Sequence, residues 1–307
     1  VMAKYALDAL REIYDNPTFT LVGKKNILEL FKLDGYNYNL IEDDTKNEKN
    51  RITATIKLGK TIGRHDIAIT FQNSFLSALL LYFSGTHIRV GYKKECRSML
   101  LTHALKAQEN HQAYEYLRLA SFEQKEVKIL KETSYAIKRA PEQNIIAVAP
   151  GAAYGSSKRW LPERFAELID KMPEIEFLLL GSKEDIPLGY KIEKHISNSS
   201  SQCRNLIGTT TLAELAELLS KCAITISNDS GIMHLSASLK VPTVAIFGPT
   251  DKSKTSIWDT TPNIIVQNPP KCSPCKFREC PKERHICMEN ITVDDLFFAI
   301  KNLRSFL

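Results

Sequence analysis

The 307-residue chain lacks several patterns that would place it in a membrane, outside the cell or on nucleic acid. No apolar run approaches the roughly 18 residues of a membrane-spanning helix, and the residues after Val1 form no secretory signal. No Gly-x-Gly-x-x-Gly follows a predicted strand, which argues against a dinucleotide-dependent oxidoreductase. We find no repeat, no low-complexity segment and no basic stripe interleaved with aromatic residues, so we expect no nucleic-acid partner.

The cysteine content does not suit a disulfide-stabilised domain. The seven cysteines are an odd number, and Cys96, Cys203 and Cys222 are dispersed along the chain. This usage favours a reducing cytoplasm. Hydrophobic residues make up 43% of the sequence and charged residues 25%, as in ordinary soluble globular proteins. The length suffices for two domains of about 150 residues each.

The most informative segment runs from residue 223 to residue 251. Residues 223–227 and 243–247 have the β-branched composition of buried strands, and apolar residues between them have helical spacing. Strand, helix and strand in about 25 residues predict a βαβ unit with parallel strands. The polar turn 228–231 then lies at the carboxyl end of the first strand, where ligands of open α/β sheets bind. Asp229 or Ser230 could cap the helix, whose free N–H groups and dipole favour a diphosphate.

Strands and helices alternate along both halves of the chain, which predicts an α/β fold with two doubly wound parallel sheets. In the first half we predict a helix over residues 2–14, a strand over 18–22 and a helix over 74–83. The stretch 111–138 is predicted to be wholly helical. Residues 140–144 are the predicted linker, and a strand over 145–149 opens the second half.

Three blocks of the sequence resemble bacterial heptosyltransferases of glycosyltransferase family nine. The first is Asp229-Ser-Gly-x-x-His234 with the run Val-Pro-Thr-Val-Ala-Ile-Phe-Gly-Pro-Thr-Asp over residues 241–251. The second is Ala-Pro-Gly-Ala-Ala-Tyr-Gly-Ser-Ser-Lys-Arg-Trp-Leu-Pro-Glu-Arg-Phe-Ala-Glu-Leu-Ile over residues 149–169. The third has the spacing Cys272-x2-Cys275-x4-Cys280-x6-Cys287 and is similar to the type II members of the family. The resemblance extends over essentially the whole chain.

The resemblance implies the GT-B architecture, in which two Rossmann-like domains face a cleft. Residues 1–140 would bind the acceptor and residues 145–307 the nucleotide-sugar donor. The implied activity is inverting transfer of heptose from ADP-L-glycero-D-manno-heptose to the heptosyl-Kdo-lipid A inner core of lipopolysaccharide. The resemblance also implies that the protein acts at the cytoplasmic face of the inner membrane. It implies no cofactor and no tightly bound catalytic metal.

The distribution of charge is compatible with an anionic acceptor. Residues 1–145 contain 22 Lys and Arg against 17 Asp and Glu, a net +5, whereas the remainder has a net charge of +1. A basic first domain would suit a phosphate- and carboxylate-bearing lipid core and the membrane surface that carries it. Solubility alone explains a net charge of this size equally well.

Lys158 is the predicted catalytic cation. It follows a loop of small residues between a strand and a helix, where an ammonium can stabilise the leaving diphosphate. The alternative is that Lys158 and Arg159 are solvated surface charges. The resemblance implies that Asp229 contacts the donor sugar as an orienting group and that His234 lies beside the phosphates. Trp160 is predicted to pack beneath the loop.

Other residues are predicted to line the donor site. Glu184 follows a strand and could accept hydrogen bonds from ribose hydroxyls, or it could be an ordinary carboxylate at a helix start. Thr210 could line the adenine pocket, although Thr210 or Thr211 would serve equally as an N-cap. The remaining predicted donor contacts lie in loops and turns at strand ends: Gly151, Ala152, Ser157, Ser230, Gly231, Gly248, Thr250 and Asp251.

The cysteine-rich block carries a competing signal. Four thiolates could form a tetrahedral structural zinc site from Cys272, Cys275, Cys280 and Cys287. The second pair is separated by six residues, which is a poor zinc knuckle, and His285 adds no clear ligand pattern. The alternative is a loop of reduced thiols.

The first domain departs from the family pattern. Family members begin with a strand and a Gly-Asp turn before the helix that opens this sequence, and the Asp of that turn is the proposed general base. We therefore expect either an incomplete sequence of an active enzyme or a nucleotide-sugar-binding protein without turnover. We favour the former because the absent strand would be central in the first sheet. A family member with another donor or acceptor is a further alternative.

Overall fold

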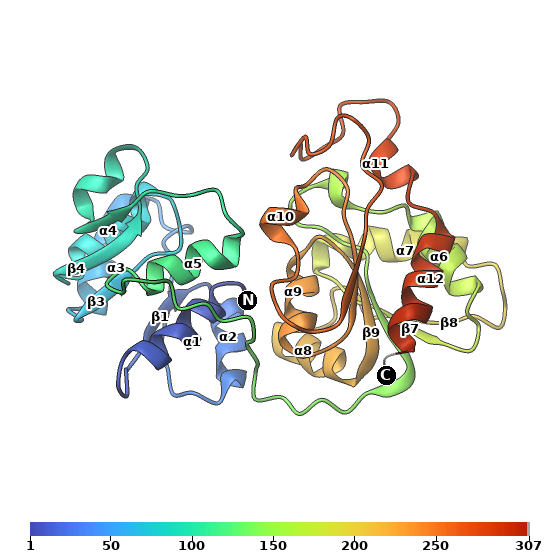
Figure 1. Cartoon of the computed structure of the whole chain (residues 1–307), viewed down its shortest axis with the longest axis horizontal. Coiled ribbons are helices and arrows are strands. Elements are labelled where there is room, and N and C mark those ends of the chain that lie inside the picture. The colour runs from blue at the N-terminus through green and yellow to red at the C-terminus, as the bar shows by residue number, and fades with distance from the viewer. Residues whose placement is uncertain (306–307) are drawn as a thin grey trace. The chain divides into compact units, whose positions relative to one another are not determined.

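The computed structural model describes residues 1–305, apart from the side chain of Glu95. The chain forms two compact units, the first over Met2–Thr133 and the second beginning at Ser134. In Figure 1 the first unit is coloured from blue to green and the second from green to red. Every strand pair among the described residues is parallel, which confirms the predicted α/β class.

Within the described part of the first unit, parallel strands form a two-stranded sheet, β1-β2, and a three-stranded sheet, β3-β4-β5. The elements are α1 (Lys4–Ile13), β1 (Thr20–Gly23), α2 (Lys25–Phe31), η1 (Lys32–Asp34), β2 (Asn39–Glu42), α3 (Arg51–Ile62), β3 (Ile67–Ile69), α4 (Phe75–Phe83), β4 (Ile88–Tyr92), η2 (Glu95–Leu100), β5 (His103–Leu105) and α5 (Gln112–Ala120). Helix α1 is amphipathic and buries Tyr5, Leu7 and Leu10 along one side.

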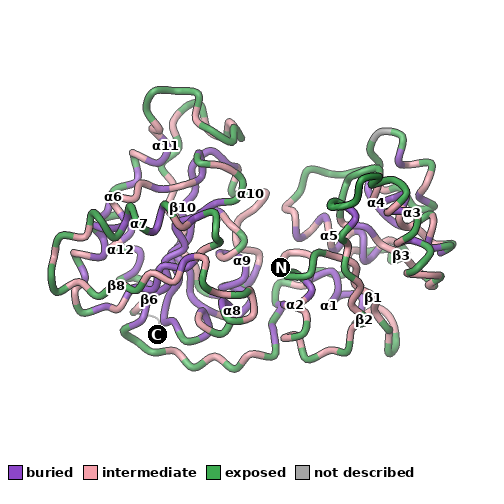
Figure 2. Tube along the Cα trace, turned by 180° about the vertical axis from the view of Figure 1, so that it is seen from behind, coloured by how far each residue is buried: buried purple, intermediate pink, exposed green. Residues whose placement is uncertain are grey.

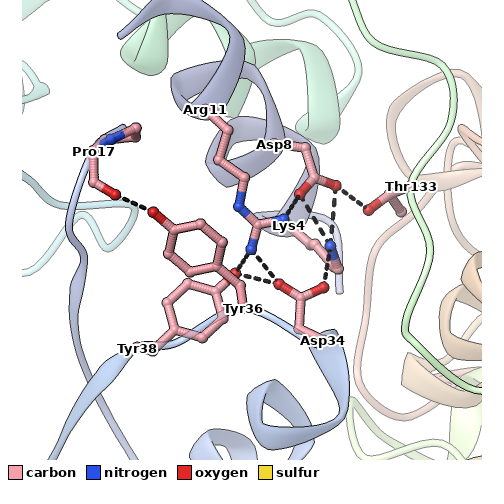
Figure 3. Close-up of polar contacts among 8 residues, drawn as sticks. All are labelled: Lys4, Asp8, Arg11, Pro17, Asp34, Tyr36, Tyr38 and Thr133. Carbon is pink, nitrogen blue, oxygen red and sulfur yellow. Dashed lines mark hydrogen bonds and ion pairs between the residues drawn. The ribbon is translucent and has the colours of Figure 1, made fainter. Parts of the chain in front are cut away.

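Charged side chains near the start of the first unit form a network in which Lys4 and the Asp34 side chain are buried and Asp8 and Arg11 are partly buried (Figure 3). Lys4 Nζ lies 2.6 Å from Asp34 Oδ1 and 3.0 Å from Asp8 Oδ1. Arg11 pairs with both carboxylates, and the Tyr38 hydroxyl donates a hydrogen bond to Asp34. Burial raises the pKa of Asp34, but hydrogen bonds from Lys4, Tyr38 and Arg11 outweigh it and hold this pKa below its ordinary value.

One prediction for the first unit is wrong, and one helix was not predicted. The stretch 111–138 is not wholly helical, because α5 ends at Ala120. Ser121 follows the helix, and its hydroxyl accepts a hydrogen bond from the backbone N–H of Lys128, which favours a turn over a further helical turn. The sequence also contains a helix that we did not predict, α3, whose first turn is capped by the side chain of Asn50.

In the described part of the second unit, six parallel strands form one sheet in the order β11-β10-β9-β6-β7-β8. The elements are β6 (Glu142–Ala149), η3 (Ser156–Lys158), α6 (Pro162–Asp170), β7 (Glu176–Leu179), η4 (Lys183–Asp185), α7 (Ile186–His195), β8 (Gln202–Asn205), α8 (Leu212–Lys221), β9 (Cys222–Asn228), α9 (Gly231–Ser238), β10 (Thr243–Ile246), α10 (Lys252–Thr255), β11 (Asn263–Val266), α11 (Ile286–Glu289) and α12 (Val293–Arg304).

Helices cover both faces of this sheet (Figure 1). Helices α6, α7 and α12 contribute to a continuous apolar core that includes Ile146, Phe165 and Ile300. Helices α8 and α9 contact the central strands β9 and β6 or β10. The central strands are almost wholly buried (Figure 2), as their β-branched composition predicts for a sheet covered on both sides. No helix among residues 1–305 is long and apolar enough to cross a membrane.

Candidate active site

The second unit has a topological switch point between β6 and β9. From β6 the chain moves outward through β7 and β8, and it then returns to β9 and moves outward the other way through β10 and β11. The loops after β6 and after β9 therefore leave the sheet in opposite directions from neighbouring strand ends. Ligands of doubly wound sheets bind in the crevice that such a divergence opens.

A buried ion pair joins these two loops. Lys158 Nζ lies 2.5 Å from Asp229 Oδ2, and the two residues are only 8% and 5% exposed. Lys158 lies in η3 after β6, and Asp229 directly follows β9. The Thr250 hydroxyl, beyond the end of β10, donates a hydrogen bond of 2.7 Å to the same carboxylate oxygen. Lys158 is therefore not a solvated surface charge.

The ion pair is supported by residues beneath and beside it. The side chain of Asn228 donates to the carbonyl of Pro150 at 2.7 Å and accepts from the backbone N–H of Trp160 at 3.2 Å, so it joins both loops. Trp160 packs beneath the loop, as predicted, and its indole N–H donates to the carbonyl of Ile291. The ring of Tyr154 lies beside the ammonium of Lys158, with 4.8 Å between the nitrogen and the ring centroid.

The role of Asn228 was not predicted from the sequence. The available signal was an amide side chain at the end of a strand predicted to be buried, because a buried polar group needs hydrogen-bond partners. The partners themselves lie in a loop more than 65 residues away along the sequence. Only the sheet order brings them together.

The first loop also contains a close backbone approach at Gly151. A Cβ atom at this position would come within 2.3 Å of the Asp185 carboxylate, so a larger residue would require the Asp185 side chain to move. Asp185 is held in turn by the Ser182 backbone N–H and hydroxyl. Ala152 and Ser157, from the same loop, are buried.

Three predicted donor residues lie in the turn after β10. Thr250 contacts Asp229, whereas Asp251 caps helix α10 and accepts hydrogen bonds from the Ser253 backbone and hydroxyl. These bonds lower the pKa of Asp251. The carbonyl of Gly248 accepts a hydrogen bond from the Ser273 hydroxyl. Thr250 thus belongs to the ion-pair cluster, whereas the side chain of Asp251 serves as the N-cap of α10.

The predicted caps of α9 are wrong in detail. Ser230 is the residue at the N-cap position, but its side chain makes no capping bond and instead lies 3.1 Å from the Ser227 hydroxyl. The Asp229 side chain is turned to Lys158 and Thr250 rather than to the helix. Gly231, the first residue of α9, is exposed. His234 is buried in the first half of this helix.

Two further predicted contacts lie outside the ion-pair cluster. Glu184 is exposed in η4, after β7. Thr211 caps α8 in a reciprocal arrangement with Glu214, which leaves Thr210 half-buried just before the cap. Their suggested contacts with ribose and adenine stay predictions.

The cysteine-rich segment packs on the Lys158 loop. The Ser157 backbone N–H donates to the carbonyl of Arg278 at 3.1 Å, and His285 Nε2 donates to the carbonyl of Ser157 at 2.8 Å. The Tyr154 hydroxyl donates to the carbonyl of Lys276 at 2.6 Å. Most of the segment is otherwise exposed (Figure 2). It therefore fixes the loop that carries Lys158 through backbone contacts.

The thiols of this segment line one small cavity, formed in part by Cys272, Cys275, Cys280 and Cys287. Burial, together with the neighbouring cysteines, raises the pKa of Cys287 to about 11. Among the described residues, no three His, Cys, Asp or Glu side chains are arranged as a metal-binding group. The structural zinc site stays a prediction.

The sequence and the fold are similar to those of known glycosyltransferases. The chain matches the model of glycosyltransferase family 9 (heptosyltransferase) over residues 55–286. It is 31% identical to lipooligosaccharide heptosyltransferase 2 of Campylobacter jejuni, with 99% of this chain and 94% of that protein covered.

Two solved structures share the fold. The ADP-heptose lps heptosyltransferase II of Escherichia coli has a TM-score of 0.80 and 22% identity, covering 99% of this chain and 94% of its own. The glycosyl transferase family 9 protein of Veillonella parvula has a TM-score of 0.86 and 20% identity, covering 100% of this chain and 94% of its own. The family match and the Campylobacter jejuni relative show that the present chain is a glycosyltransferase. More specifically, it belongs to glycosyltransferase family 9, the heptosyltransferase family.

Proposed function

We propose that this chain transfers heptose from ADP-heptose to a heptose of the lipopolysaccharide inner core, with inversion at the anomeric carbon. The observation that carries the proposal is the buried Lys158–Asp229 pair at the switch point of the second unit. Its support includes the family match and the Campylobacter jejuni relative named heptosyltransferase 2. The Escherichia coli protein of similar fold is an ADP-heptose heptosyltransferase, which supports this donor.

The proposed mechanism gives each residue of the pair a role. The acceptor hydroxyl attacks the anomeric carbon, the bond from that carbon to the diphosphate oxygen breaks, and ADP leaves with the bonding electrons. Lys158 would lie beside the departing diphosphate and stabilise its growing negative charge. Asp229 holds the ammonium at the strand ends, and its remaining carboxylate oxygen would orient a hydroxyl of the sugar.

The second unit binds the donor in this proposal, and the first binds the acceptor. The resemblance assigns removal of the acceptor proton to an Asp in a Gly-Asp turn before α1, which is not part of the printed sequence. We further propose that no resident metal takes part in transfer, and that the protein works in the cytoplasm at the inner membrane surface, where the lipid acceptor lies.

A transfer assay tests the proposal. The chain, and a version extended by the family's strand and Gly-Asp turn, are incubated with ADP-heptose and heptosyl-Kdo-lipid A. ADP release and the mass of the lipid are followed together. We expect the extended protein to release ADP and add one heptose to the lipid. Transfer from another nucleotide sugar, or ADP release without a heavier lipid, would contradict the proposed donor or acceptor.

A further inference from the structure

The ion pair at the switch point of the second unit has no net charge. Lys158 Nζ lies 2.5 Å from Asp229 Oδ2, so the carboxylate already neutralises the ammonium. In the proposed reaction, the donor diphosphate carries negative charge on both phosphates, and breaking its bond to the sugar adds one more. Such charge is stabilised by cations that are held in place before the reaction. We therefore expect a further cation at the same strand ends.

The cysteine-rich segment is attached to two loops at these strand ends. The carbonyl of Arg278 accepts a hydrogen bond of 3.1 Å from the backbone N–H of Ser157, which follows β6. The backbone N–H of Lys276 donates to the carbonyl of Pro249, which follows β10, at 3.0 Å. Strand β9 lies between β6 and β10 in the sheet, and Asp229 directly follows it. The segment is thus anchored to the loops on either side of the ion pair.

The backbone fit between the segment and the first of these loops is close. A Cβ atom on Gly155 would come within 2.1 Å of the carbonyl oxygen of Arg278, which is backbone and cannot turn away as a side chain could. Lys276 has a left-handed backbone, with φ at 58°, and its carbonyl accepts a hydrogen bond of 2.6 Å from the Tyr154 hydroxyl. A left-handed conformation of a residue other than glycine persists where its surroundings hold it. The backbone on both sides of Phe277 is therefore fixed against the loop that carries Lys158.

Arg278 and Lys158 lie beside the same aromatic ring. The guanidinium carbon of Arg278 is 5.5 Å from the centroid of the Tyr154 ring, and Lys158 Nζ is 4.8 Å from the same centroid. The negative face of an aromatic ring attracts cations. The ring therefore helps to hold the guanidinium near the ammonium, although the two groups have the same charge.

Arg278 differs from other arginines near the site in having no carboxylate partner. Arg284, in the same segment, pairs with Glu289 at 2.7 Å, and Arg159 pairs with Asp185 at 3.3 Å. Within residues 1–305, no described Asp or Glu side chain forms an ion pair with Arg278. Its side chain is exposed. The positive charge of Arg278 is thus accessible to a ligand and is not neutralised by a partner.

We propose that Arg278 is a second cation of the donor site, which binds the donor diphosphate together with Lys158. The inference rests on the proposed function, because the anion is taken to be the diphosphate of a nucleotide sugar. A guanidinium presents parallel N–H groups that match two phosphate oxygens. Residues 271–285 contain five Lys and Arg against two Asp and Glu, so the whole segment attracts an anion. Arg278 supplies the net positive charge that the Lys158–Asp229 pair lacks.

Nucleotide binding tests the proposal without a transfer reaction. ADP and adenosine are titrated by calorimetry into the full chain and into its Arg278→Gln and Arg278→Lys variants. Arg278→Gln should weaken ADP binding by about tenfold or more, because it removes a charge-assisted contact with phosphate. Adenosine has no phosphate, and its affinity should change less than about twofold. Arg278→Lys, which keeps the charge but not the fork, should bind ADP better than Arg278→Gln. Equal ADP affinity in wild type and Arg278→Gln would overturn the proposal.

Arg284→Gln is the matched control. It removes the same charge from the same segment, but Arg284 already has a partner in Glu289. We expect its ADP affinity to stay within about twofold of wild type. The melting temperature of Arg278→Gln should equal that of wild type, because the side chain is exposed. If Arg284→Gln weakened ADP binding as much as Arg278→Gln, the general charge of the segment would explain the effect, and the specific role of Arg278 would be rejected.

Kinetics in the extended protein separate this inference from the proposed function. Arg278→Gln should lower kcat/KM for ADP-heptose by about tenfold or more and change the KM for the lipid acceptor less than about threefold. Equal transfer rates in wild type and Arg278→Gln would reject the role of Arg278 and retain the proposed function. ADP binding that depends on Arg278, in an extended protein that transfers no heptose, would retain the cation site and reject the proposed function. An increase confined to the acceptor KM would contradict the assignment of Arg278 to the donor.

Discussion

Each unit of the protein contains a cluster of opposite charges that is largely buried. The two clusters differ in which elements of the fold carry them. In the first unit, Lys4 and Arg11 meet Asp8 and Asp34 within the first 34 residues, on α1 and η1. In the second unit, Lys158 meets Asp229 across 71 residues, at the ends of two adjacent central strands. Burial and pairing are common to both, so neither property alone identifies a functional site.

The difference lies in what each cluster connects. The first network ties α1 to η1 and receives a hydrogen bond of 2.5 Å from Thr133, the last residue of the unit (Figure 3). It balances two cations with two carboxylates among the residues drawn, as a structural network should. The second cluster lies at the switch point, where a ligand can replace one partner of the pair. Position at the strand ends therefore separates the cluster that we propose to be functional from the one that we interpret as structural.

The largest effect is expected from breaking the first network. Asp34→Asn removes the carboxylate that pairs with both Lys4 and Arg11, and it leaves one of the two cations without a counter-charge. The substitution should lower the free energy of unfolding by about 3–5 kcal/mol. Urea unfolding at pH 7 measures the loss, with the exposed Asp15→Asn as the control. ADP-heptose binding by the second unit should persist in any protein that stays folded. Loss of ADP-heptose binding in a folded Asp34→Asn protein would contradict the interpretation that the first network is only structural.

The same network predicts a pH dependence. Because the pKa of Asp34 is lowered on folding, its contribution to stability is fully present above the pKa of an unfolded Asp, about 3.9. The contribution is lost as the pH falls through the lower pKa of the folded state. The stability difference between wild type and Asp34→Asn should therefore be constant from about pH 5 to 8 and shrink below about pH 4. A difference that grew on acidification would contradict the assignment.

Breaking the second cluster should affect activity more than stability. Lys158→Ala is expected to slow transfer by roughly 10²-fold or more, because it removes the cation that we propose stabilises the leaving diphosphate. Lys171→Ala is the matched control, since Lys171 is an exposed lysine paired with Asp294 on the same unit. Steady-state rates in the extended protein provide the comparison. Equal transfer rates for the two variants would contradict a catalytic role for Lys158.

A smaller effect is expected from the hydroxyl that completes the second cluster. Thr250→Val keeps the shape but removes the hydrogen bond to Asp229, and it should lower kcat by about tenfold. Ser253→Ala, which removes a hydroxyl bonded to the Asp251 cap in the next turn, should change kcat less than about twofold. Similar losses in both variants would show that the turn as a whole, rather than the Asp229 contact, is what matters.

Much of the second unit could be predicted from its sequence. Strands β9 and β10 and residues 145–149 of β6 are runs of buried, mostly β-branched and small residues, so their existence and parallel pairing follow from composition and spacing. The motif resemblance selected Lys158 and Asp229, but their mutual contact depends on the order of strands in the sheet. Edge strands such as β8 (Gln202–Asn205) were missed because they are polar and only half-buried, and thus lack the hydrophobic signal.

The first unit was less predictable for a related reason. Its sheets are short, its strand β5 is largely exposed, and the stretch 111–138 has polar residues on every side after Ala120. Arg97, in η2, is buried, but nothing in the sequence distinguishes it from its basic neighbours Lys93 and Lys94. Its burial arises from tertiary packing against β4 and the turn after β3.

The most direct test of the central claim is calorimetric titration of ADP-heptose into the chain, its extended version and the Lys158→Ala variant. The account predicts that both wild-type proteins bind the donor and that Lys158→Ala binds at least about tenfold more weakly, a loss of about 1.4 kcal/mol. No binding by a folded wild-type protein, or equal binding by Lys158→Ala, would contradict the placement of the donor diphosphate at the Lys158–Asp229 pair.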